Sequence, residues 1–135
     1  MDDLTPNEVD FLTLEDVFVL VEQLLGTRHQ VRDAGLIDAA VARPRAVLFG
    51  ADVYPGLSGK AAALVHSLVR NHALVDGNKR LGLAATLLFY GLNDCELVAT
   101  DDELFSLIMA IADGTLADVE AIATMLKPWE RTGRA

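Results

Sequence analysis

The fold is decided by residues 60–92, which read KAAALVHSLVRNHALVDGNKRLGLAATLLFYGL. Two apolar runs, Ala61–Arg70 and Leu81–Leu92, flank the polar segment His72–Arg80. Both runs exceed the usual length of a strand, and the first holds neither glycine nor proline, so each is typical of a buried helix. Ser58 is a suitable cap for the first of these helices. The stretch therefore predicts two buried helices joined by a turn that is exposed on one side.

Three more helix starts are indicated by capping patterns, in which a hydroxyl accepts from a free backbone N–H and an acid three residues on reaches back. The pairs are Thr13 with Asp16, Thr100 with Glu103, and Thr115 with Asp118. Apolar residues at three- and four-residue steps extend the first of these helices over about Leu14–Leu25. We expect the second helix to stop near Gly114 and the third to end before Pro128.

The segments between these helices are short. A helical piece is expected around Leu36–Arg43, ending at Pro44 because proline disfavours the helical conformation of the residue before it. Only Glu96–Ala99 and part of Val47–Tyr54 have the pattern of extended chain. No internal repeat, low-complexity tract or linker divides the chain. The sequence therefore predicts one all-α domain over residues 1–135, with its core within about residues 14–127.

The composition excludes several classes of protein. With 135 residues, 52% hydrophobic and 23% charged, the chain is neither disordered nor a large modular enzyme. The net charge of −9 repels phosphate backbones, which argues against direct binding to DNA. The single cysteine, Cys95, cannot form an internal disulfide, and no uncharged apolar run is long enough for a membrane span. Because the amino terminus is acidic and lacks the pattern of a signal peptide, we expect a cytoplasmic protein.

The polar segment between the apolar runs has the features of an anion site. Asp76 and Gly77 form a turn signal, and Asn78 is suited to cap the helix that follows. That helix then begins with Lys79 and Arg80, two cations that face the positive pole of the helix dipole. Such an arrangement is unfavourable unless an anion joins it, and free N–H groups beside a turn glycine form a phosphate cradle. We therefore expect this turn to bind a nucleoside triphosphate.

Two further residues of the segment suggest group transfer. A carboxylate beside phosphates is tolerated as a ligand to a shared Mg²⁺ ion, which is the role expected for Asp76. A free imidazole titrates near neutral pH, so the side chain of His72 is suited to take a proton from a hydroxyl nucleophile. Residues 60–80 also hold four basic residues against one acidic residue, which concentrates positive charge near the proposed site. The alternative for His72 is a histidine that merely ends a helix.

Other polar residues are expected to be structural. His66 lies within an apolar run and is expected to be satisfied in the core rather than to bind a ligand. Arg32, Asp33 and Arg43 are expected to form an ion pair that fixes a loop. Residues Gly56–Lys60 superficially resemble a P-loop, but the glycines are too close together and no Ser or Thr follows the lysine. Three scattered histidines and one distant cysteine do not supply a zinc site.

The sequence HALVDGNKR of residues 72–80 resembles the signature HxFx(D/E)xN(G/K)R of the Fic/Doc family. Its Asn-Lys-Arg ending is similar to the Doc branch, the toxins of toxin–antitoxin pairs. The similarity continues through Arg32–Leu36, Ala42–Pro44 and Lys60–Asn71, and covers roughly residues 14–127. It implies a compact Fic/Doc-type helical domain with at most a short β flap.

The resemblance also implies a role for each matching residue. It implies that His72 is the general base, that Asp76 is the Mg²⁺ ligand, and that Gly77, Asn78, Lys79 and Arg80 hold the phosphates of ATP. In relatives, the region before the first long helix carries a flap that aligns the protein target by strand-like pairing. Phe49 and Tyr54 are therefore expected to contact the target.

For activity, the Doc resemblance implies a Mg²⁺-dependent kinase. Doc transfers the γ-phosphate of ATP to a hydroxyl of elongation factor Tu, and an antitoxin of the Phd type is the expected inhibitor. Most Fic proteins transfer AMP instead, but Lys79 replaces their glycine and its bulk and charge favour the kinase orientation. AMP transfer to a protein hydroxyl is one alternative, and a non-catalytic binding module is another.

Three positions depart from the family patterns. Leu74 replaces a phenylalanine that points into the core, so its effect is expected on stability rather than on chemistry. Gly77 replaces the alanine of the Doc pattern. Leu83 stands where the longer Fic signature has a second arginine, and that arginine is absent from Doc as well.

Overall fold

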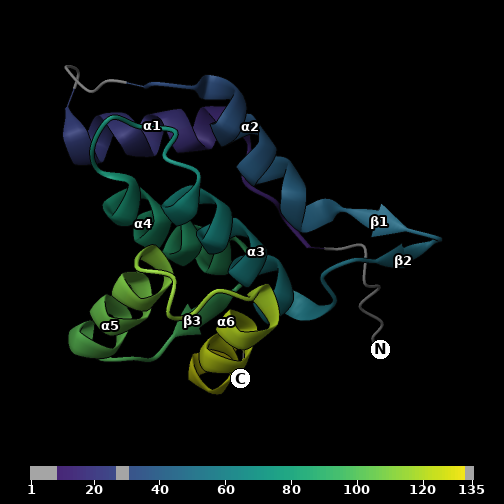
Figure 1. Ribbon diagram of the computed structural model, residues 1–135. Helices are drawn as coiled ribbons and strands as arrows, with labels where there is room; N and C mark the ends of the chain where they lie inside the picture. The colour runs from purple at the N-terminus through teal and green to yellow at the C-terminus, as the bar shows by residue number, and fades with distance from the viewer. Residues whose placement is uncertain (1–8, 27–30, 133–135) are drawn as a thin grey trace.

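The computed structural model describes residues 9–26 and 31–132 (Figure 1). Within these residues the α-helices are α1 (Leu14–Leu25), α2 (Ala34–Ala42), α3 (Gly56–Arg70), α4 (Asn78–Leu92), α5 (Asp101–Ala112) and α6 (Val119–Leu126). Short 3-10 turns follow α2 and α6, at η1 (Arg43–Arg45) and η2 (Lys127–Trp129). The strands are β1 (Val47–Leu48), β2 (Ala51–Asp52), β3 (Cys95–Leu97) and β4 (Glu130–Thr132). The predicted all-α class is confirmed.

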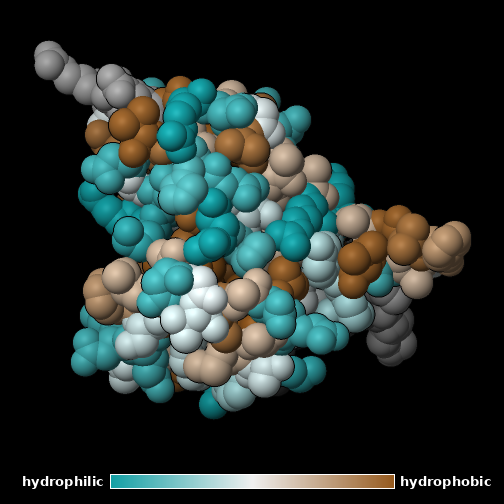
Figure 2. All heavy atoms as spheres, viewed as in Figure 1, coloured by the Kyte–Doolittle hydropathy of each residue, from teal (hydrophilic) through white to brown (hydrophobic). Residues whose placement is uncertain are grey.

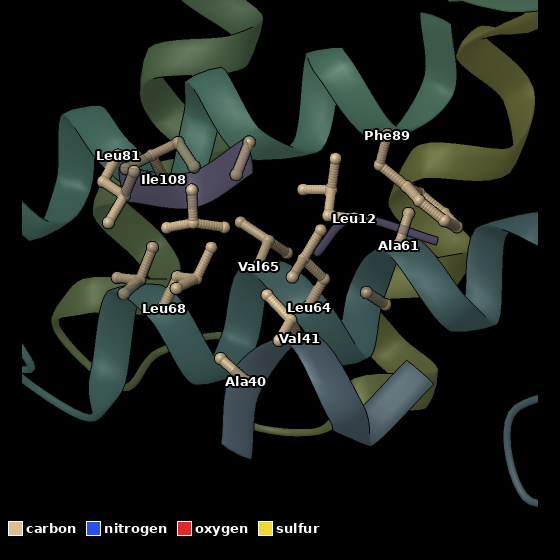
Figure 3. Close-up of a cluster of buried hydrophobic side chains, with 14 of the residues drawn as sticks. Leu12, Ala40, Val41, Ala61, Leu64, Val65, Leu68, Leu81, Phe89 and Ile108 are labelled. Atoms are coloured by element: carbon tan, nitrogen blue, oxygen red, sulfur yellow. The ribbon is translucent and has the colours of Figure 1, made fainter. Parts of the chain in front are cut away.

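Helix α3 lies at the centre of the core, in contact with α2, α4, α5 and α6. In Figure 3 its buried side chains meet Leu81 and Phe89 of α4 on one side and Val41 of α2 on the other. Helices α3 and α4 approach closely at Gly82, where an added Cβ would lie 2.5 Å from Val69 Cγ2. The two apolar runs are thus the buried helix pair that the sequence predicts, and the turn between them is fixed by their packing.

Two of the predicted helix starts are confirmed in detail. Thr13 and Thr100 each form a complete capping box with the acid three residues on, and α1 and α5 begin at the next residue. Gly26, with a φ of 81°, ends α1 as expected. Both helices end within two residues of the predicted glycine stops. Their ends are well predicted because side-chain caps are local interactions.

Two other predicted caps are wrong. Helix α3 begins at Gly56, before Ser58, and follows Pro55, which has no backbone N–H to leave unpaired at a helix start. Helix α6 begins after Asp118, because the backbone N–H of Thr115 donates instead to Asp113 Oδ1, 2.8 Å away. Neither helix start has a side-chain cap: the N-cap residues are Pro55 and Asp118. The helix predicted around Leu36–Arg43 is present as α2, which begins two residues earlier.

The strands form two small antiparallel pairs. The β1–β2 hairpin projects from the helical body, in the region predicted to be partly extended (Figure 1). Strand β3 pairs with β4 in the register Cys95↔Thr132, and the sequence offered no sign of the second of these strands. Burial raises the pKa of the Cys95 thiol, which favours its protonated form. No helix of residues 9–26 and 31–132 is long and apolar enough to cross a membrane.

Candidate active site

The turn between α3 and α4 carries the residues of the predicted site. His72 is exposed and follows the end of α3, and its φ of 55° is in the left-handed region. Leu74, two residues on, is completely buried. Leu74 thus anchors the turn in the core, while the imidazole of His72 stays exposed.

The backbone of the turn is held by the segment that precedes α2. Arg32 donates from Nε and Nη2 to the carbonyl oxygen of His72, at 3.1 and 2.5 Å. The backbone N–H groups of Arg32 and Asp33 donate to the carbonyl oxygen of Ala73, at 2.7 and 3.0 Å. A β-bridge between Val31 and Leu74 completes the contact. We call this set of interactions the Arg32 clamp; the local sequence around His72 carries no signal for it.

The start of α4 differs from the prediction. The residue that caps the helix is Gly77, with a φ of 96°, and Asn78 is the first helical residue. The side chain of Asn78 instead accepts from the backbone N–H of Leu74 and donates to its carbonyl oxygen, both at 3.0 Å. Asn78 therefore closes the turn on itself, and the predicted cap is wrong because its amide reaches back across the turn. A Cβ at Gly77 would lie 2.7 Å from Leu25 Cδ1.

The two cations at the start of α4 have different surroundings. Both are exposed. Arg80 donates from Nη2 to the carbonyl oxygen of Leu24 at the end of α1, 3.4 Å away. Lys79 has no hydrogen bond or ion pair with the described part of the chain. The argument for an external anion therefore rests on Lys79 and stays a prediction, whereas Arg80 already has a weak partner.

The prediction that four basic residues within 60–80 concentrate positive charge at the site is only partly right, because two of them are used elsewhere. Lys60 is buried and pairs with Asp52 Oδ2 at 3.0 Å, while it donates to the Tyr54 carbonyl at 2.7 Å. Arg70 donates to the carbonyl oxygen of Ala112 at the end of α5, 2.7 Å away. Both side chains are therefore used in holding the fold. Of the four basic residues in this range, Lys79 and Arg80 at the start of α4 are the two beside the turn.

Asp76 is an exposed carboxylate beside the open end of α4. Its Oδ1 accepts from the backbone N–H of Gly77 at 2.9 Å, and Oδ2 has no partner among the described residues. A hard oxygen donor of this kind suits Mg²⁺, which commonly takes one or two carboxylates and completes its shell with phosphate oxygens and water. The described residues hold no cluster of three or more potential metal ligands. Asp76 therefore fits a cation shared with a phosphate rather than an all-protein metal site.

A hollow of about 400 Å³ lies beside Lys79 and Arg80, between α4 and α5. Its remaining lining is nearly all apolar and consists of Leu83, Leu104, Phe105, Ile108 and Met109, with Asp101 at its edge. Leu83 extends this apolar surface at the position where the longer Fic signature has an arginine. The site thus offers cations next to an apolar surface, which suits a ligand with an anionic part and a flat apolar part.

The predicted flap residues lie in different environments. Phe49 is at the tip of the β1–β2 hairpin and is 98% exposed, next to the exposed Val47 and Leu48. Figure 2 shows the tip as an apolar projection from the body. Tyr54 lies at the base of the hairpin, where its hydroxyl accepts from Arg43 Nε at 2.8 Å. Phe49 is therefore accessible to a protein target, and Tyr54 is used mainly in anchoring the hairpin.

Arg43 connects the hairpin to α3, and the predicted ion pair with Arg32 and Asp33 is wrong. Besides Tyr54, Arg43 donates from Nη1 to His66 Nδ1 and to Ser67 Oγ, both at 3.0 Å. Asp33 instead caps α2, and Arg32 belongs to the clamp at His72. His66 is structural, as predicted.

The protonation state of His66 leads to a pH-dependent stability. Burial lowers the pKa of His66, and the neighbouring Arg43 and Arg70 lower it further, against the opposing effects of Ala117 and Asp118. Below a pH of about 6.5 the unfolded chain therefore binds more protons than the folded one, so stability falls as the pH falls. We expect the melting temperature to drop more steeply between about pH 7 and pH 5 in the wild type than in His66→Gln. Glutamine can accept from Arg43 without titrating, and identical pH profiles of the two proteins would contradict the expectation.

Comparisons with known proteins identify the family of this chain. Residues 11–90, which include the whole turn and its clamp, match the model of the Fic/DOC family. The chain belongs to the Fic/Doc family. It is similar to Toxin Doc of Mycolicibacterium smegmatis (strain ATCC 700084 / mc(2)155), with 52% identity over 93 residues, 69% of this chain and 72% of the relative. The Doc-type resemblance is thereby confirmed, and the family is one of transferase-type enzymes.

Proposed function

We propose that this protein is a cytoplasmic toxin that transfers the γ-phosphate of ATP to a Ser or Thr hydroxyl of a translation factor. The acceptor implied by the Doc resemblance is elongation factor Tu, and an antitoxin of the Phd type would neutralise the activity. The observation that carries the proposal is the juxtaposition of the exposed imidazole of His72, the exposed carboxylate of Asp76 and Lys79, which has no partner among residues 9–26 and 31–132, around the open end of α4. These are the groups that phosphoryl transfer to a hydroxyl requires.

The start of α4 binds the phosphates. Its first N–H groups have no intrahelical acceptors, and Lys79 and Arg80 add two positive charges at the same end. Asp76 would hold Mg²⁺ there, and the ion would supply charge neutralisation between neighbouring phosphate oxygens. The apolar hollow between α4 and α5 has room for the nucleoside part of the molecule.

The transfer step uses His72. The imidazole takes the proton of the acceptor hydroxyl as its oxygen forms a bond to the γ-phosphorus. The bond from that phosphorus to the bridging oxygen breaks, and ADP leaves with the electron pair. The proton remains on His72 until solvent removes it. Lys79 favours this outcome over AMP transfer, because its side chain occupies the space next to Asn78 that a glycine would leave open.

The reaction is tested by incubating the protein with purified elongation factor Tu, Mg²⁺ and ATP labelled at either the α or the γ phosphate. We expect label on the acceptor from the γ position only. Label from the α position would mean AMP transfer and would contradict the kinase proposal. Absence of transfer, together with no heat on titration with Mg-ATP, would mean a non-catalytic binding module. Asp76→Asn tests the carboxylate, because it keeps the shape of the side chain while removing its charge. We expect this variant to transfer much less phosphate than the wild type.

A further inference from the structure

The backbone conformation of His72 requires a partner to maintain it. A φ of 55° is uncommon for a residue with a side chain, because Cβ approaches the backbone oxygen. Such conformations persist only where the surrounding structure fixes them, and they are often found at active sites. The direction of the imidazole follows from this φ, so whatever fixes the backbone at His72 also aims the base.

The Arg32 clamp supplies that fixation from a distant part of the sequence. Two successive carbonyl groups, those of His72 and Ala73, each accept two hydrogen bonds from residues 32 and 33. The contact to His72 comes from the side chain of Arg32, whose planar guanidinium presents two donors to one oxygen. The contact to Ala73 comes from the backbone and would survive a change of side chain.

The clamp is itself anchored in the core. Asp33 Oδ1 accepts from the backbone N–H groups of Gly35 and Leu36, at 2.9 and 3.3 Å, and so caps α2. Helix α2 buries Ile37 and Ala40 completely. Arg32 thus extends from a well-packed helix start to the carbonyl of the proposed base, and its position is set by the fold.

We infer that Arg32 is a positioning residue for the general base. It acts through the carbonyl oxygen of His72 and does not touch the substrate. This inference rests on the proposed function, since it assigns to Arg32 a share of the same transfer step. It separates Arg32 from Lys79 and Arg80, which act on phosphate directly.

The test is a double-mutant cycle with elongation factor Tu and γ-labelled ATP. Arg32→Met keeps the length of the side chain and removes both donors. We expect kcat to fall by about 100-fold, the effect typical of misplacing a reacting group, with the KM for ATP unchanged. In the His72→Ala background the same substitution should have no further effect, because there is no base left to position. Arg32→Lys should recover only part of the loss, since an ammonium cannot present two coplanar donors.

Controls separate positioning from general damage. Arg131→Met removes an exposed arginine from β4, remote from the turn, and should leave kcat unchanged. Urea unfolding of Arg32→Met checks that the chain is folded. The three-bond coupling between the amide and α protons of His72, measured by NMR, reports its φ without any need for activity. We expect this coupling to change in Arg32→Met, as His72 leaves the left-handed region.

Several outcomes would overturn the inference. Arg32 would not act through the base if Arg32→Met kept the full kcat, or if it raised the KM for ATP with kcat unchanged. The same would follow if Arg32→Met lowered kcat in the His72→Ala background by as much as in the wild type. An unchanged coupling at His72 would have the same meaning. If the wild type itself transfers no phosphate, the proposed function fails, and the NMR comparison still decides whether Arg32 holds the conformation of His72.

Discussion

Replacing His72 by alanine is expected to lower kcat for phosphate transfer by about 100- to 10,000-fold, the usual contribution of a general base. The imidazole is exposed and has no hydrogen-bond partner for its ring within the described residues, so its removal should cost little stability. Initial rates with γ-labelled ATP and purified elongation factor Tu measure the effect directly. Cells that express the variant should lose the growth arrest expected of the wild type.

The matched control for His72 is His66→Gln, which removes the other described imidazole of this region. His66 lies within α3, before His72 in the sequence, and is hydrogen bonded to Arg43. We expect this variant to keep the kcat of the wild type, because His66 contacts Arg43 rather than the turn. Undiminished toxicity of a folded His72→Ala protein would refute the assignment of the base.

The largest expected effect on stability is at Leu74. This side chain is completely buried at the centre of the turn, and its backbone bridges to Val31. Leu74→Ala is expected to lower the free energy of unfolding by about 2–5 kcal/mol, from lost apolar burial and the cavity left behind. Because small domains are stable by only about 5–15 kcal/mol, the variant should unfold at a markedly lower urea concentration.

Leu87→Ala is the comparison for Leu74. Leu87 is in α4 and is 41% exposed, so the same chemical change there should cost much less than at Leu74. The residual folded Leu74→Ala protein should still bind Mg-ATP, because the start of α4 is unchanged. Equal losses of stability in the two variants would mean that Leu74 does not anchor the turn.

The parts of the fold that could be predicted from sequence are those set by local interactions. The α3–α4 pair follows from two long apolar runs, and the ends of α1 and α5 follow from capping boxes in which a side chain meets its own helix. The helix caps predicted at Ser58, Thr115 and Asn78 are wrong because a polar side chain or a helix start has several local options. Pairing of β3 with β4 joins distant segments, and the residues Glu130–Thr132 have no strand pattern.

The same distinction applies to the site. His72, Asp76 and Lys79 are candidates from sequence alone because they are neighbours with complementary chemistry, and the structure leaves all three exposed around one turn. The Arg32 clamp could not be predicted, since a carbonyl oxygen accepts from any suitably placed donor and its own residue type gives no clue. The local excess of positive charge misled in part because Lys60 and Arg70 satisfy internal oxygens. Proximity in sequence does not reveal which face of a helix a cation occupies.

The backbone at Gly77 changes how a difference from the Doc pattern should be interpreted. A φ of 96° disfavours any residue with a Cβ, and alanine there would also force Leu25 to move. Glycine at this position is therefore explained by the geometry of the turn and its contact with α1. Its presence says nothing about whether phosphate or AMP is transferred, so sorting relatives into kinases and AMP transferases by this residue would misassign chains whose turn is built in this way.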